Sequence, residues 1–176
     1  METPELGRQA RSYSLLLMAM VLALLAGCAT QSGLKSSSRS GGYTSRHIVI
    51  DSAKRNDVAL TAMGLLGTRY RYGGSSPNTG FDCSGLIQYV FENVANAQLP
   101  HNTAEIAQVS RPVPRSKLSV GDFVFFNTLN SPYSHMGIYI GDGQFVNAPS
   151  TGGHVRIDAL SSSYFAKRYE GARTLF

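Results

Sequence analysis

Residues 134–148 read Ser134-His135-Met136-Gly137-Ile138-Tyr139-Ile140-Gly141-Asp142-Gly143-Gln144-Phe145-Val146-Asn147-Ala148. Two short runs rich in β-branched and aromatic residues flank the Gly141-Asp142-Gly143 turn. Such a turn between such runs predicts an antiparallel hairpin. His135 begins this hairpin and Asn147 lies near its end, so pairing of the two strands would bring the two polar side chains close together.

The segments before the hairpin predict helices. Over 51–66, apolar residues recur at intervals close to three and four, which is typical of an amphipathic helix, and Gly67 would end it. Asp82 can cap a second helix over 83–93. A short third helix is expected over 103–108. The buried side of the second helix would carry Leu86, Ile87, Val90 and Phe91.

Further short runs of β-branched and aromatic residues predict the rest of a sheet. Strands are expected at 122–126, 154–157 and 168–175, in addition to the two strands of the hairpin. Helices that come first and a meandering antiparallel sheet that follows make the predicted class α+β, with N-terminal helices packed on a C-terminal sheet of about five to six strands.

The N-terminus reads as a targeting signal. Arg8 and Arg11 precede an apolar run over about 13–26, which is shorter than the roughly 20 residues of a membrane-spanning helix. The sequence Leu25-Ala26-Gly27-Cys28 resembles a bacterial lipobox, in which the cysteine is diacylated and becomes the first mature residue. We therefore expect a signal peptide over 1–27 and a lipid anchor at Cys28.

The residues after Cys28 predict a tether and a location. Ala29 stands where an Asp would indicate retention in the inner membrane, so the outer membrane facing the periplasm is expected in a bacterium with two membranes. Residues 28–47 are rich in Ser and Gly, a composition typical of a flexible linker. The folded domain is expected over 48–176.

The charge of the chain restricts its partners. A formal net charge of +5 suits an anionic partner such as wall polymer or phospholipid headgroups. The Lys and Arg residues are scattered, and no zinc-finger or RNP-like motif is present, so no nucleic-acid partner is expected.

Cys83 is the candidate nucleophile. It follows Asp82 at the predicted first turn of a helix, where unpaired main-chain N–H groups favour a thiolate. The negative charge of Asp82 would disfavour that thiolate, which assigns Asp82 to helix capping or to substrate contact. From local context alone, a reactive thiol and an inert core thiol are equally good interpretations of Cys83.

Four histidines could supply a base, and His135 is the best placed of them at the start of a predicted core strand. Asn147 is the candidate for orienting its ring, with His154 as the rival. His101 and His47 are more typical of surface positions. No pair of histidines has the helical spacing of a zinc hydrolase, so no metal site is expected.

Four motifs occur in order within residues 58–176. They are Leu65-Leu66-Gly67-Thr68-Arg69-Tyr70-Arg71-Tyr72-Gly73-Gly74, Phe81-Asp82-Cys83-Ser84-Gly85-Leu86, Leu118-Ser119-Val120-Gly121-Asp122-Phe123-Val124-Phe125-Phe126 and Ser134-His135-Met136-Gly137-Ile138-Tyr139-Ile140-Gly141. In this order they resemble the NlpC-type cell-wall cysteine peptidases, a papain-like family.

The resemblance implies a role for each matching residue. Cys83 would be the nucleophile, His135 the general base and acid, and Asn147 the orienting residue at a position where this family more often has His. Tyr70 matches a tyrosine that helps to form the oxyanion site, although Tyr72 lies close to it in sequence. Substrate contacts would come from Asp82 and Ser84.

The resemblance also implies an activity. The expected reaction is hydrolysis of peptidoglycan stem-peptide or cross-link amide bonds through an acyl-enzyme, at D-glutamyl-diaminopimelate or diaminopimelate-centred bonds. The enzyme would need no cofactor and would act as a monomer. The alternatives are a non-catalytic envelope lipoprotein that binds wall peptide, and an amidase or acyltransferase on the same fold.

Overall fold

The computed structural model describes residues 47–151 and 153–176. The predictions of a signal peptide and of a lipid anchor at Cys28, and nearly all of the predicted tether, lie outside these residues. Within the described part, no helix is both long and apolar enough to cross a membrane.

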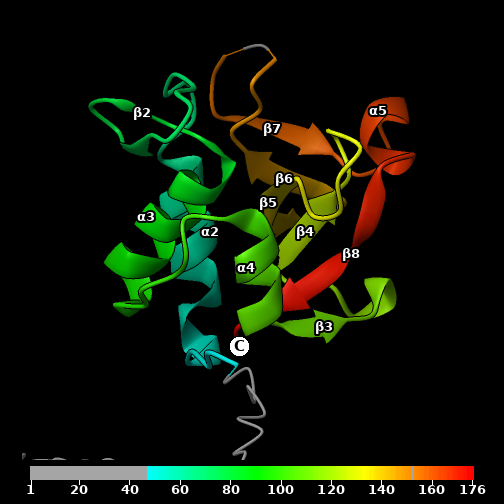
Figure 1. Ribbon diagram of the computed structural model, residues 1–176. Helices are drawn as coiled ribbons and strands as arrows, with labels where there is room; N and C mark the ends of the chain where they lie inside the picture. The colour runs from blue at the N-terminus through cyan, green and yellow to red at the C-terminus, as the bar shows by residue number, and fades with distance from the viewer. Residues whose placement is uncertain (1–46, 152) are drawn as a thin grey trace, which may run out of the picture. The chain divides into compact units, whose positions relative to one another are not determined.

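The helices lie mainly in the first half of the described chain, as the sequence predicts (Figure 1). They are η1 (Ser52–Lys54), α2 (Arg55–Met63), α3 (Cys83–Ala95), α4 (Thr103–Val109), η2 (Arg115–Lys117) and α5 (Ser163–Ala166). The first predicted helix is shorter than 51–66 and divided. Asp51 accepts a hydrogen bond from the main chain of Ala53 and starts a 3-10 turn, and beyond α2 the chain turns until Gly67 at φ +82°.

A six-stranded antiparallel sheet in the order β3-β8-β4-β5-β6-β7 forms the second layer. Its strands are β3 (Arg111–Val113), β4 (Phe123–Phe126), β5 (His135–Gly141), β6 (Gln144–Asn147), β7 (Arg156–Ala159) and β8 (Tyr169–Thr174). A separate pair, β1 (Ser75–Ser76) and β2 (Gly80–Phe81), lies in the loop before α3. The α+β class and the predicted hairpin are confirmed, with Ile138 opposite Val146 in β5 and β6. Strand β3 was not predicted from the sequence; it is an edge strand and tolerates Pro112 because one of its sides has no partner strand.

Both faces of the central strand β4 are buried. Phe123 and Phe125 pack into a large cluster with the buried stripe of α3, whereas Val124 and Phe126 pack into a smaller cluster with Phe165 of α5. Helices α2 and α3 therefore cover one face of the sheet, and α5 covers part of the other (Figure 1). This double burial explains the uninterrupted apolar run of β4, which does not alternate as a half-exposed strand would.

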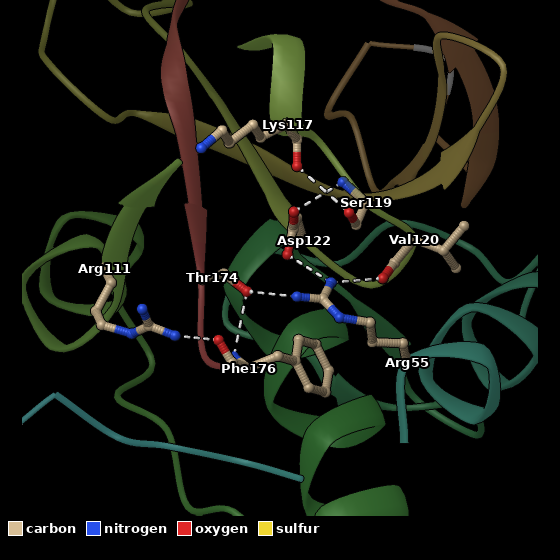
Figure 2. Close-up of polar contacts among 8 residues, drawn as sticks. All are labelled: Arg55, Arg111, Lys117, Ser119, Val120, Asp122, Thr174 and Phe176. Atoms are coloured by element: carbon tan, nitrogen blue, oxygen red, sulfur yellow. Dashed lines mark hydrogen bonds and ion pairs between the residues drawn. The ribbon is translucent and has the colours of Figure 1, made fainter. Parts of the chain in front are cut away.

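A polar cluster joins the helices to the sheet at the end where β4 begins. Arg55 of α2 donates to Asp122 Oδ1 at 2.7 Å and to the Val120 carbonyl at 2.9 Å (Figure 2). Its other terminal nitrogen lies 3.4 Å from the Thr174 hydroxyl, and its guanidinium lies over the Phe176 ring. We call these residues the Arg55 cluster. Because Phe126 at the other end of β4 pairs with His135, this cluster and His135 lie at opposite ends of the strand.

The loop from 69 to 82 is packed tightly onto the first turn of α3. A Cβ atom added at Gly85 would lie 2.0 Å from the Gly74 carbonyl oxygen, a distance that no real side chain allows. The main chain of Asp82 donates to the same oxygen at 3.0 Å. Gly85 therefore lets the loop that carries Tyr70 lie directly beside Cys83.

Candidate active site

Cys83 is the first residue of α3 and is half-buried. Its sulfur interacts with the main-chain N–H groups of Cys83, Ser84 and Met136. Since Met136 belongs to β5 and follows His135 directly, the thiol lies where the helical layer meets the strand that carries the imidazole.

Burial favours the neutral form of the thiol. Burial is the main cause that raises the pKa of Cys83 to about 11, and the negative charge of Asp82 raises it further. The three N–H groups act in the opposite direction but do not outweigh burial. The two expected effects are both present: the helix start favours the thiolate and Asp82 opposes it, while burial is larger than either. Such a thiol needs a base when it attacks.

His135 is buried, with 7% of its surface exposed, and begins β5. Burial lowers the pKa of His135, although its hydrogen bond to Asn147 partly offsets this effect. Its ring is stacked on Phe165 of α5, with ring centroids 6.1 Å apart. A neutral imidazole held in this way can accept a proton, which is what the neutral thiol requires.

Asn147, at the end of β6, binds the imidazole directly. Its Oδ1 lies 3.0 Å from His135 Nε2, and its amide is fully buried. Gly137 lets the end of β6 lie close to β5, since a Cβ there would come within 2.7 Å of the Val146 carbonyl oxygen and 3.2 Å of the Asn147 Cβ. The rival residue His154 is exposed and forms an isolated bridge with Arg69.

Tyr70 lies near the thiol and is partly buried. Burial raises the pKa of Tyr70, and the charges of Cys83 and Asp82 raise it further, which places the phenol within electrostatic reach of both. Its main chain bridges Phe81, directly before Asp82. Tyr72 is 89% exposed, so the alternative to Tyr70 points away from the buried site.

Asp82 is the centre of a buried polar network. Its Oδ1 accepts hydrogen bonds from the Gly85 main chain at 2.8 Å and from the Ser84 hydroxyl at 3.1 Å. Its Oδ2 accepts one from the Gly73 main chain at 2.8 Å. The helix-capping interpretation of Asp82 is thus observed directly, and the Ser84 hydroxyl is directed to this carboxylate.

His101 is exposed, as expected, but it also joins this network. Its Nε2 lies 3.0 and 3.2 Å from the two carboxylate oxygens of Asp82. The sequence carries no signal for this contact, because His101 lies in a loop between α3 and α4 and reaches Asp82 only once α3 has formed.

A cavity of about 170 Å³ opens beside His135. It is lined by His135, Thr128, Pro149, Ser150, Thr151, Arg156, Tyr164 and Phe165. Hydroxyl groups, one guanidinium and aromatic rings thus border the imidazole, a lining suited to a polar peptide group. Within 47–151 and 153–176, no group of three or more His, Cys, Asp and Glu side chains is placed to hold a metal ion.

Comparison with known proteins places the chain among relatives of similar sequence and fold. The NlpC/P60 family matches residues 67–174. Murein DD-endopeptidase MepH of Escherichia coli (strain K12) is 40% identical over 124 residues, covering 68% of this chain and 46% of that protein. The probable endopeptidase NlpC homolog of Haemophilus influenzae is 38% identical over 144 residues, covering 81% and 75%.

Solved structures agree with these sequence matches. An NlpC/P60 family protein from Bacillus cereus has a TM-score of 0.65 at 26% identity, covering 74% of this chain and 42% of that one. The NlpC/p60 domain of the peptidoglycan hydrolase SagA has a TM-score of 0.60 at 28% identity, covering 68% and 97%. The chain spans less than half the length of several of its curated relatives, MepH among them. From its matched motifs and its papain-like α+β fold, the chain belongs to the NlpC/P60 family.

Proposed function

We propose that this protein is a cysteine-type peptidoglycan hydrolase in which Cys83, His135 and Asn147 carry the reaction. The observation that carries the proposal is the 3.0 Å hydrogen bond between His135 and Asn147, formed where the β5 main chain meets the Cys83 sulfur. A half-buried thiol, a buried imidazole and an orienting amide together form the set of groups that acyl transfer needs.

The reaction begins from the neutral pair. Nδ1 of His135 takes the thiol proton as the Cys83 sulfur forms a bond to the substrate carbonyl carbon. The oxyanion is stabilised by the main-chain N–H of Cys83 and by the Tyr70 phenol, and such a donor contributes about 2.7–4 kcal/mol in the transition state. The imidazolium then gives its proton to the leaving amine as the C–N bond breaks.

Hydrolysis of the acyl-enzyme returns the site to its starting state. Water attacks the thioester carbonyl while His135 takes one of its protons, the C–S bond breaks, and the proton returns to the sulfur. Asp82 and Ser84 flank Cys83 in the sequence and would contact the substrate peptide through the groups left free by their own hydrogen bonds.

The substrate proposed is the stem peptide of peptidoglycan, at a D-glutamyl-diaminopimelate or a diaminopimelate-centred amide bond. The family match and the relatives named as murein endopeptidases support this choice, and the net charge of +5 suits an anionic wall. We further propose that the protein acts in the cell envelope as a monomer, anchored by lipid at Cys28 to the outer membrane where there is one.

The test is a digest of purified peptidoglycan and defined muropeptides with the full chain, with products identified by mass spectrometry. We expect new free amines and carboxylates at one stem-peptide bond, and none with Cys83→Ala of unchanged circular dichroism. Equal products from the two proteins would exclude cysteine catalysis. Binding of wall peptide without products would identify a binding lipoprotein, and cleavage at the sugar-linked amide or transfer products would identify an amidase or acyltransferase.

A further inference from the structure

Asp158 of β7 contacts the orienting amide from the side opposite His135. Asn147 Nδ2 lies 3.0 Å from Asp158 Oδ2 and 3.3 Å from the Arg156 carbonyl oxygen. While Asp158 is ionised, its carboxylate and the Arg156 carbonyl oxygen accept hydrogen bonds and cannot donate them. The amide atom that faces β7 must therefore be the nitrogen, and the atom that faces His135 must be the oxygen.

This orientation determines the tautomer of the imidazole. An amide oxygen can only accept, so the His135 nitrogen 3.0 Å from it must carry the proton. A neutral imidazole has one proton, and with that proton on Nε2 the other nitrogen, Nδ1, has a free lone pair. A general base needs this lone pair to take the thiol proton.

Without Asp158, the preference for this orientation is weaker. The Arg156 carbonyl would be the remaining acceptor for the amide nitrogen, at the longer distance of 3.3 Å. An amide rotated by half a turn would present its nitrogen to His135 and favour the proton on Nδ1, the tautomer that cannot act as the base.

We propose that Asp158 is a positioning residue whose carboxylate fixes the amide of Asn147 and thereby keeps the His135 proton on Nε2. The statement about the tautomer rests on geometry alone, whereas its effect on turnover rests on the proposed function. Asp158 reaches the reacting atoms through two other side chains and does not touch them itself.

Arg156 provides the matched comparison. Its Nε donates to the same oxygen, Asp158 Oδ2, at 2.8 Å, and one of its terminal nitrogens donates to the Thr151 carbonyl. Arg156→Gln removes this ion pair but keeps both the Asp158 carboxylate and the main-chain carbonyl of residue 156. It therefore separates loss of the carboxylate from loss of the ion pair.

The first measurement is 15N NMR of the full chain labelled at histidine, because ring-nitrogen shifts distinguish the two tautomers without any substrate. The wild type and Arg156→Gln should show His135 with its proton on Nε2, and Asp158→Ala should show a mixture. Asp158→Asn should retain the wild-type tautomer, since its side-chain oxygen can still accept. A pure Nε2–H form in folded Asp158→Ala would overturn the proposal.

The second measurement is a double-mutant cycle in muropeptide cleavage. Asp158→Ala should lower kcat roughly tenfold with KM little changed, which is the size expected for loss of a charged hydrogen bond. In an Asn147→Ala background the same change should cost less than twofold. Equal losses in both backgrounds would show that Asp158 acts only on the stability of β7.

The pH profile of kcat/KM provides a third measurement, in which the Asp158 and Arg156 variants should shift the acid limb in opposite directions. Asp158 raises the pKa of His135 and Arg156 lowers it, so Asp158→Asn should move the acid limb to lower pH and Arg156→Gln to higher pH. Shifts in the same direction would contradict the placement of these charges. The charged and polar groups that act on His135 are Asn147 from β6 and Asp158 and Arg156 from β7, and the rings that pack against it are Phe126 from β4 and Phe165 from α5.

The proposed function and the role of Asp158 fail in different ways. If the wild-type chain cleaves no wall peptide, the proposed function is wrong, and the tautomer measurement still decides the role of Asp158.

Discussion

At the scale of single residues, the pKa values of Cys83 and His135 both shift toward the neutral form. Burial is the main cause for each, since it raises the pKa of the thiol and lowers the pKa of the imidazole. We therefore expect the proton to pass from Cys83 to His135 as the new bond to sulfur forms. The raised pKa of Cys83 also makes the free energy of unfolding depend on pH.

Cys83→Ala should make the free energy of unfolding less sensitive to alkali. The pKa of Cys83 rises from its ordinary value of 9.0 to about 11 on folding, so the unfolded chain loses this proton first as pH increases. Between about pH 9 and 11 the wild type should lose on the order of 2 kcal/mol relative to the variant. Urea unfolding of both proteins at pH 8 and pH 10.5 measures this difference, and a difference that is independent of pH would contradict it.

Asn147→Ala should lower kcat roughly tenfold to a hundredfold and leave clear residual activity, because the imidazole stays in place but loses the partner on Nε2. His154→Ala is the matched control and should stay within twofold of the wild type. Muropeptide turnover of the purified proteins provides the measurement. If His154→Ala proves the more damaging change, His154 and not Asn147 is the residue that orients His135.

Motifs identify some of these residues and cannot identify others. Cys83 and His135 stand in local patterns, a helix start and a strand start, that the sequence displays directly. His101 and Asp158 act through partners in other elements, and neither stands in a local pattern that points to chemistry. Their contacts exist only after α3 and the β5–β7 pairing have formed, so no reading of neighbouring residues could have found them.

At the scale of elements, burial patterns are what the sequence predicts best. The expected buried stripe of α3 is fully buried, because four apolar residues at helical spacing have only one layer to pack on. The division of the first helix and the edge strand β3 were missed. The division of the helix depends on a side-chain hydrogen bond of Asp51, and the strand β3 can contain Pro112 only because it lies at the sheet edge.

Gly85→Ala should be strongly damaging to the site. The new methyl group would collide with the Gly74 carbonyl, and the loop that carries Tyr70 must move away from Cys83. We expect a loss of about 1–3 kcal/mol in the free energy of unfolding, as for other overpacked sites, together with a large drop in turnover.

Gly64→Ala is the control for this change. A Cβ there would meet its nearest neighbour, the Thr61 carbonyl oxygen, at 3.4 Å, and the Gly64 φ of −63° suits any residue. Thermal unfolding and turnover should both remain near wild type. Similar behaviour of the two alanine variants would show that the loop is not held where we describe it.

At the scale of the whole molecule, the Arg55 cluster joins α2 to both β4 and β8 at the end of the sheet opposite His135. Arg55→Ala should cost roughly 3–5 kcal/mol, because it leaves Asp122 charged with only 1% of its side chain exposed. Arg111→Ala is the control, since Arg111 is exposed and its contact with the Phe176 carbonyl lies near the same chain end. Urea unfolding compares them, and equal losses would contradict a central role for Arg55.

The smaller apolar cluster on the second face of β4 includes Phe165, whose ring also stacks on His135. This cluster has only six buried members, and its helix α5 is four residues long, so it should loosen on heating before the large cluster does. Heating should therefore inactivate the protein several degrees below the temperature at which its helices melt. The temperature range of activity would then be set by α5, and Phe165→Leu should narrow it further while the melting temperature changes less.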